Sequence, residues 1–198
     1  DRSSFSRYQY PSNLPLDVQY RLMDIARRVI QQIDMDDTCF NIEFFYNQTD
    51  DQIYLLEINP RLSQSHADLF EKVHGFSHQQ VLLDIVLGQR PFPMERKGQY
   101  PLAAKFFLRH YEPGRVERAP TDQEIQNLQR HYPGLKVEVM VQEGMDLSDL
   151  KHQDSYSFEL AEIYLGAQNE MDLLNKYDEV VSQLPFRIEG SEPSSLSF

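Results

Sequence analysis

The fold is decided by the stretch Leu55-Leu56-Glu57-Ile58-Asn59-Pro60-Arg61-Leu62, together with Phe40-Asn41-Ile42-Glu43-Phe44-Phe45 shortly before it. Both runs are apolar and aromatic at alternate positions, and the Asn/Asp-rich segment 47–51 joins them, which is typical of a β-hairpin. Pro60 ends the second strand because proline donates no hydrogen bond to a ladder. The sequence therefore predicts strands over residues 39–46 and 52–59.

The polar residues of this hairpin suggest a metal site. Side chains alternate between the faces of a strand, so Asn41 and Glu43 share one face. Glu57 and Asn59 likewise share a face, and a hairpin centred on the joining segment sets Glu43 opposite Glu57. Opposed carboxylates repel, and a cation between them reverses the sign of that interaction. Two carboxylates and an amide suit Mg²⁺ or Mn²⁺, so we predict Glu43, Glu57 and Asn59 as ligands, with Arg61 beside the metal to hold an anion.

A second interpretation of these residues stays open. Glu and Asn on the solvent face of a half-buried hairpin are ordinary, and they need no metal. A register slip of one residue would also turn the whole set to the other face.

The rest of the chain predicts an α+β fold. Apolar periodicity predicts helices over 16–33, 77–87, 122–131 and 170–183, and strands over 102–109, 136–142 and 156–164. Expected helix caps are Ser12 or Asn13, Ser77 and Thr121. The Pro-, Gly- and charge-rich segment 89–98 separates two parts, which we place at 1–92 and 93–198. The Ser-rich tail 189–198 is expected to fray.

Composition narrows the function. The 198 residues hold 19 Lys and Arg against 31 Asp and Glu, a net charge of −12, which argues against nucleic acid and anionic membranes as partners. A divalent cation would have to mediate any contact with polyphosphate. No apolar run approaches the roughly 20 residues of a membrane span. A single cysteine suits the cytoplasm, where we expect the protein.

The hairpin resembles the end of the ATP-grasp fold. In that superfamily a Glu on one strand and Glu-x-Asn on the next hold the magnesium ions of ATP, which implies these roles for Glu43, Glu57 and Asn59 and makes ATP the cofactor. Arg61 matches a position that contacts substrate or phosphate. The similarity continues through Ser63-Gln64-Ser65-His66, and it implies that Arg61 and His66 are the catalytic residues, with His66 as a substrate contact or proton carrier.

The second half is also similar to known enzymes. Ala103-Ala104-Lys105-Phe106-Phe107, Gly114-Arg115-Val116 and the helix from Glu170 resemble the domain that follows the grasp in biotin-carboxylase-like and amino-acid-ligase-like enzymes. The resemblance implies that 1–92 is the C-terminal portion of an ATP-grasp domain and that 93–198 is a smaller α+β domain.

Two departures qualify the resemblance. The family's glycine-rich loop and its ATP-binding lysines precede the first strand, yet residues 1–38 contain no Lys and nothing before Cys39 matches. Since the chain also lacks an initial Met, we expect a C-terminal fragment that is inactive by itself. Biotin carboxylases place a catalytic Glu four residues after the Arg, where this chain has Ser65, which argues against a carboxylase.

The resemblance implies an ATP-dependent ligase. Such enzymes form an acylphosphate from ATP and a carboxylate, then join it to an amine and release ADP and phosphate. The expected partners are therefore a small-molecule carboxylate and a small-molecule amine, and a homodimer is left open. The alternatives are a non-catalytic or regulatory ATP-grasp-like module and, less favoured, a carboxylase. The intact set of Glu43, Glu57, Asn59 and Arg61 favours the enzyme, because opposed charges persist only where a ligand uses them.

Overall fold

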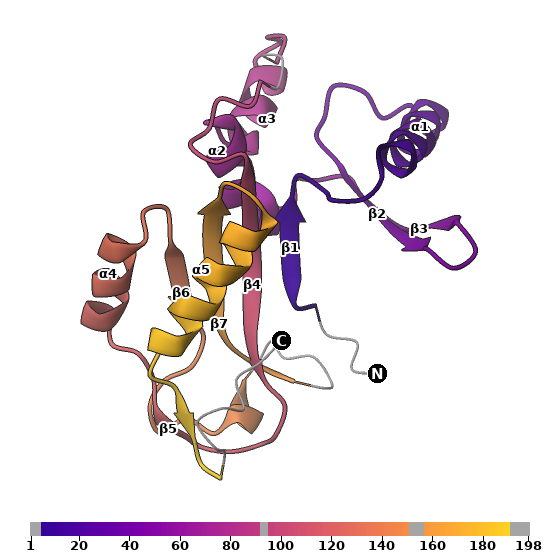
Figure 1. The fold of residues 1–198 in the computed structure, drawn as a ribbon. Coiled ribbons are helices and arrows are strands. Elements are labelled where there is room, and N and C mark those ends of the chain that lie inside the picture. The colour runs from indigo at the N-terminus through magenta and orange to yellow at the C-terminus, as the bar shows by residue number, and fades with distance from the viewer. Residues whose placement is uncertain (1–4, 92–94, 151–156, 191–198) are drawn as a thin grey trace.

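The structure is a computed structural model that describes residues 5–91, 95–150 and 157–190. Its centre is a 4-stranded antiparallel sheet in the order β1-β4-β7-β6 (Figure 1). These strands are β1 (Arg7–Tyr10), β4 (Leu102–His110), β7 (Phe158–Ala167) and β6 (Lys136–Val139). Two further pairs form 2-stranded sheets, β2 (Asn41–Asn47) with β3 (Gln52–Asn59) and β5 (Val116–Arg118) with β8 (Arg187–Ile188). The predicted α+β class is confirmed.

Five α-helices lie among the described residues: α1 (Leu16–Gln32), α2 (Ala67–His74), α3 (His78–Val86), α4 (Asp122–His131) and α5 (Glu170–Gln183). Short 3₁₀ turns η1 (Gln64–His66) and η2 (Leu147–Asp149) complete the elements.

The central sheet is covered on both faces because side chains alternate along β4. Phe106 points to the main core, where its ring stacks on Tyr177 of α5 at 4.1 Å between centroids. Ala103 points to the other face and packs with Leu69 and Val73 of α2. The sheet is therefore a middle layer, and the face under α2 is the one that leads to the hairpin.

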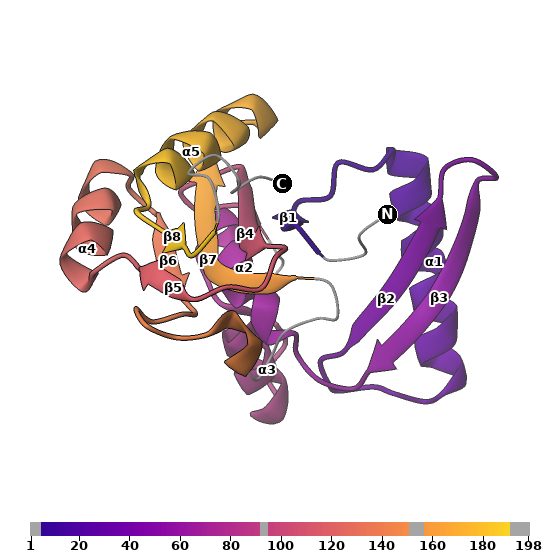
Figure 2. The ribbon, with the colours of Figure 1, turned by 90° about the horizontal axis from the view of Figure 1, so that it is seen from below.

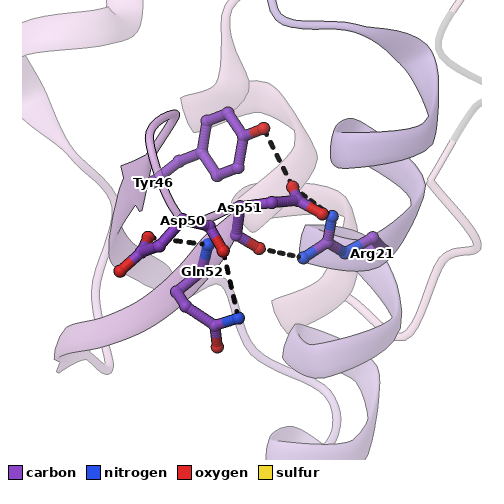
Figure 3. A network of polar contacts seen from close by, with 5 residues as sticks. All are labelled: Arg21, Tyr46, Asp50, Asp51 and Gln52. Carbon is purple, nitrogen blue, oxygen red and sulfur yellow. Dashed lines mark hydrogen bonds and ion pairs between the residues drawn. The ribbon is translucent and has the colours of Figure 1, made fainter.

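The hairpin and α1 stand to one side of this sheet (Figure 2). Arg21 of α1 is tied to the hairpin loop: its Nη1 donates to Asp51 Oδ1 at 2.7 Å and its Nη2 donates to the Asp51 carbonyl at 2.8 Å (Figure 3). Tyr46 adds a hydrogen bond to Asp51 Oδ1 at 3.0 Å, and these contacts lower the pKa of the Asp51 carboxyl. The loop is thus fixed to the helix that precedes it.

The wide apolar stripe predicted on helix 16–33 is covered on one side only. Val18 and Ile30 are buried. Leu16, Tyr20 and Met23 remain 68%, 66% and 57% exposed. Part of the apolar stripe of α1 is therefore open to solvent.

Most predicted helices and strands are confirmed within a few residues, and Thr121 forms the full capping box of α4 with Glu124. The expected cap of α1 is wrong, because Pro15 holds that position without a side-chain bond. Ser77 does cap α3, accepting a hydrogen bond from the Gln80 backbone. Strands β1, β5 and β8 and helix α2 were not predicted, and β6 stops at Val139. The expected fraying of the tail concerns mainly 191–198, which lie outside the described residues.

Candidate functional site

The predicted pairing of the hairpin is confirmed at the residues that matter for the site. Glu43 of β2 lies opposite Glu57 of β3, and Asn41 lies opposite Asn59. The two carboxylates are therefore cross-strand neighbours, whose Cβ atoms are typically about 5 Å apart in such pairs.

The rest of the hairpin pairs differently. Toward the loop, Phe44 lies opposite Leu55, so the register shifts by one residue directly beside Glu43. Leu56 is the extra residue of a β-bulge, and a bulge increases the local twist and re-aims the neighbouring side chains. The pairing next to the loop would by itself offset Glu43 and Glu57 by one residue, and the bulge restores their direct opposition.

A cavity of about 650 Å³ opens beside the carboxylates. It lies where β1, the start of β2, the segment after β3 and the start of α3 come together. Side chains that line it include Tyr8, Glu43, Arg61, Ser63, His66 and His78. Glu43, Arg61 and His66 are thus brought to one cavity, whereas Glu57 and Asn59 lie beside it on the neighbouring strand.

The hairpin residues fit a divalent cation. Both carboxylates are exposed, and neither has an ion pair with a Lys or Arg in the part of the chain that the structure describes. Within those same residues no group of three or more His, Cys, Asp or Glu side chains comes together as a metal site. The predicted set holds two carboxylates and completes its donors with the Asn59 amide. Such oxygen donors suit Mg²⁺, which keeps several waters and substrate phosphates in its shell.

Arg61 follows the second strand in a tight turn. Its backbone nitrogen donates to the Asn59 carbonyl at 2.8 Å, which keeps it close to the predicted ligand. Its guanidinium is exposed and, within the described residues, makes one hydrogen bond, to the Leu62 carbonyl at 3.2 Å. Most of its donors are therefore directed to solvent or to a ligand in the cavity.

His66 is held rigidly in the same cavity. Its Nδ1 lies 2.6 Å from Ser63 Oγ, and its ring centroid lies 5.1 Å from that of Tyr8. Burial lowers the pKa of His66, and His78 and Lys105 lower it further. The imidazole is therefore neutral near pH 7, suited to accept a hydrogen bond or a proton.

His74 and His78 do not form a zinc pair. Both ring nitrogens of His74 are engaged, with the Tyr10 hydroxyl at 2.7 Å and the Glu95 carbonyl at 3.2 Å. His78 turns instead to the cavity. Local sequence patterns did not indicate the different surroundings of His74 and His78, because these depend on how α2 and α3 pack.

A row of buried charges lies on the face of the sheet that leads to the cavity. Lys105 and Glu162 form an ion pair at 2.5 Å, and Arg109 pairs with Glu159 at 3.3 Å. Burial and the neighbouring Glu162 raise the pKa of Glu159 to about 7, although Arg109 opposes the shift. The pKa of Tyr8 is raised by burial and by Glu43, which connects this row to the hairpin electrostatically. Lys105 is 4% exposed, which is unusual for a lysine side chain.

Part of the chain is similar in sequence to known proteins. Residues 9–90 match the family described as carbamoyl-phosphate synthase L chain, ATP binding domain. The carbamoyl phosphate synthase large chain of Micrococcus luteus is 35% identical over 68 residues, which is 34% of this chain and 6% of that protein. The chain thus spans a small part of the length of the curated relatives it matches.

Solved structures show the same fold. The phosphoribosylglycinamide synthetase of Anaerococcus prevotii superposes with a TM-score of 0.67 at 10% identity, covering 96% of this chain and 48% of that one. The biotin carboxylase domain of a single-chain bacterial carboxylase gives 0.57 at 20% identity, covering 95% and 42%. At these identities the likeness concerns the fold, and it extends over both halves of the chain.

Proposed function

We propose that residues 9–90, which match the family described as carbamoyl-phosphate synthase L chain, ATP binding domain, form part of an ATP-grasp domain, and that the full-length protein is an ATP-dependent carboxylate–amine ligase. The chain would supply the metal-binding hairpin and the acceptor side of the active site. One observation carries the proposal: Glu43 and Glu57 face each other at the edge of a cavity that also holds Arg61 and His66.

The proposed reaction has two steps. A carboxylate oxygen of the first substrate attacks the γ-phosphorus of ATP, and the bond to the β–γ bridging oxygen breaks to release ADP. The uncharged nitrogen of the amine then attacks the acyl carbon, and phosphate leaves as the nitrogen gives up a proton. Both steps depend mainly on positioning and on neutralising charge.

Each predicted residue has a role in these steps. Glu43, Glu57 and Asn59 would hold Mg²⁺ (or Mn²⁺), which neutralises the phosphate oxygens of ATP when bound. Arg61 would pair with the acylphosphate or with a substrate carboxylate through its free guanidinium donors. His66, neutral and fixed by Ser63, would contact the amine or accept its proton.

We also propose the division of the chain at 92/93, a boundary that falls outside the described residues. The end of the family match at residue 90 supports it, as does a main core formed by residues beyond 100. Strand β1 crosses this division, since it pairs with β4 of the second part. The cavity residue Tyr8 sits on that strand, so the second part holds a cavity residue of the first part in place through β4.

Release of ADP and phosphate by the full-length protein tests the function. The protein is supplied with Mg²⁺–ATP and with amino acids singly and in pairs. Release that requires a carboxylate and an amine together supports the ligase. Binding of Mg²⁺–ATP with no release for any pair would favour a regulatory ATP-grasp-like module. Release that depends on bicarbonate and needs no amine would favour a carboxylase.

No helix among the described residues is long and apolar enough to cross a bilayer. The expectation of a cytoplasmic protein therefore stays a proposal, as does a homodimer.

A further inference from the structure

One buried side-chain nitrogen of a residue that lines the cavity has no hydrogen-bond partner among the described residues. His78 is 8% exposed and lines the cavity, yet its Nε2 makes no hydrogen bond among the described residues. Leaving a buried polar group unsatisfied costs about 1–3 kcal/mol. A group that carries such a cost in a polar cavity is a candidate for contact with a ligand.

The position of this imidazole is fixed by packing. His78 is the first residue of α3, directly after the Ser77 cap. Its ring meets the Phe70 ring edge-on, at 5.3 Å between centroids and 81° between planes. The start of α3 and the Phe70 ring together fix the orientation of the imidazole, and therefore the position of its Nε2. A group that contacts a substrate needs such a fixed position.

The chemistry of the cavity indicates which group would meet this nitrogen. Glu43 is the one carboxylate among the described lining residues, and the hairpin metal site uses it. A substrate carboxylate has Arg61 to pair with, whereas a substrate amine finds no free anion. The amine must also be uncharged when it attacks an acylphosphate. Neutral imidazoles suit that state, because they accept a hydrogen bond without favouring ammonium.

We propose that His78 is an amine-binding residue, whose Nε2 accepts a hydrogen bond from the uncharged nitrogen of the acceptor substrate. The assignment rests on the proposed ligase function and places the imidazole proton on Nδ1. Burial lowers the pKa of His78, in keeping with a ring that stays neutral. His78 also lowers the pKa of His66, and both imidazoles line the same cavity.

Three substitutions in the full-length protein test this role. His78→Leu removes the acceptor at similar volume, His78→Gln retains a polar acceptor, and His131→Leu on the exposed end of α4 is the control. Steady-state kinetics give the KM for the amine. Positional isotope exchange in ¹⁸O-labelled ATP, with the carboxylate present and the amine absent, follows acylphosphate formation alone.

We expect His78→Leu to raise the KM for the amine by about tenfold or more, since the lost bond leaves the amine unpaired. Isotope exchange should stay within about twofold of wild type, and His78→Gln should recover part of the loss. An unchanged KM in His78→Leu overturns the assignment. A loss of isotope exchange together with a raised KM in both variants also overturns it, because that pattern is structural. Absence of amine-dependent ADP release in the wild type instead removes the ligase function, and this role with it.

Discussion

Arg21 and Asp51 are joined twice, through the carboxylate and through the backbone carbonyl of the same residue. This link fixes the hairpin loop against α1, at the opposite end of β2 and β3 from the proposed metal ligands. The residue Asp51 has a positive φ of 55°, a conformation that an unanchored loop would leave easily. The helix therefore acts on the site through the orientation of the hairpin.

Arg21→Ala should impair ATP use more than stability. Exposed ion pairs contribute little to global stability, so the unfolding midpoint should change little. The KM for Mg²⁺–ATP should rise on the order of a few-fold, because a tilted hairpin misplaces Glu43 and Glu57. Arg28→Ala is the matched control, since Arg28 pairs only with Asp24 of its own helix among the described residues. Equal kinetics in the two variants would show that the link does not position the site.

Glu57→Gln should abolish turnover while the fold survives. The amide keeps the shape of the carboxylate but loses its charge, and losses on the order of 10²–10³ in kcat are typical for such electrostatic groups. Added Mg²⁺ should then no longer raise the unfolding midpoint in the presence of ATP. Glu71→Gln, on the exposed side of α2, is the control. Activity near wild type in Glu57→Gln would remove that carboxylate from the metal site.

The half-buried pair Glu159 and Glu162 should make stability depend on pH near neutrality. The pKa of Glu159 is raised to about 7, so the folded state holds a proton that the unfolded chain releases near pH 4.5. Stability should therefore fall as pH rises from about 5 to 7, by at most about 1.4 kcal/mol per unit.

Urea unfolding at several pH values checks this dependence. Glu159→Gln stays neutral and can still accept from Arg109, so its stability should change less across the same range. A variant that is as pH-dependent as wild type would assign the titration to another group.

Gly98→Ala should destabilise the junction between α2 and β4. A Cβ at this position would clash with the Lys72 carbonyl oxygen, a backbone atom that cannot easily move aside. The same segment is bonded to α2 through Gly98 N and the Val73 carbonyl at 3.0 Å. We expect a loss of about 1–3 kcal/mol in the free energy of unfolding. The exposed neighbour Gln99→Ala should change it by less than about 0.5 kcal/mol.

The sequence was sufficient for the hairpin because strand alternation and a short polar loop are local signals. The opposition of Glu43 and Glu57 was predicted from a simple centred hairpin, and it is correct only because the bulge at Leu56 compensates a loop-side register that differs by one. Helix α2 was missed, although Leu69 and Val73 at helical spacing before Gly75 were available as a signal.

Other features could not be predicted from local patterns. Strand β1 is four residues long, and its partner β4 begins more than ninety residues later. The burial of Lys105 depends on the layer that α2 places over the sheet, and the orphaned nitrogen of His78 depends on the contact between α2 and α3. Where distant segments pack together to form a cavity, local sequence patterns do not predict which residues line it.

Strand β1 also sets an order of events during folding. Residues 7–10 leave the ribosome long before residues 103–106, with which they pair, so the strand stays unpaired while the hairpin and helices α1, α2 and α3 emerge. Contacts of such sequence separation are slow to form because loop closure costs entropy before pairing repays it. Tyr8 lies on β1, so the lining of the cavity is complete only after β1 has paired with β4. A chain whose second half misfolds would keep the hairpin with the proposed metal ligands and still lack a complete cavity.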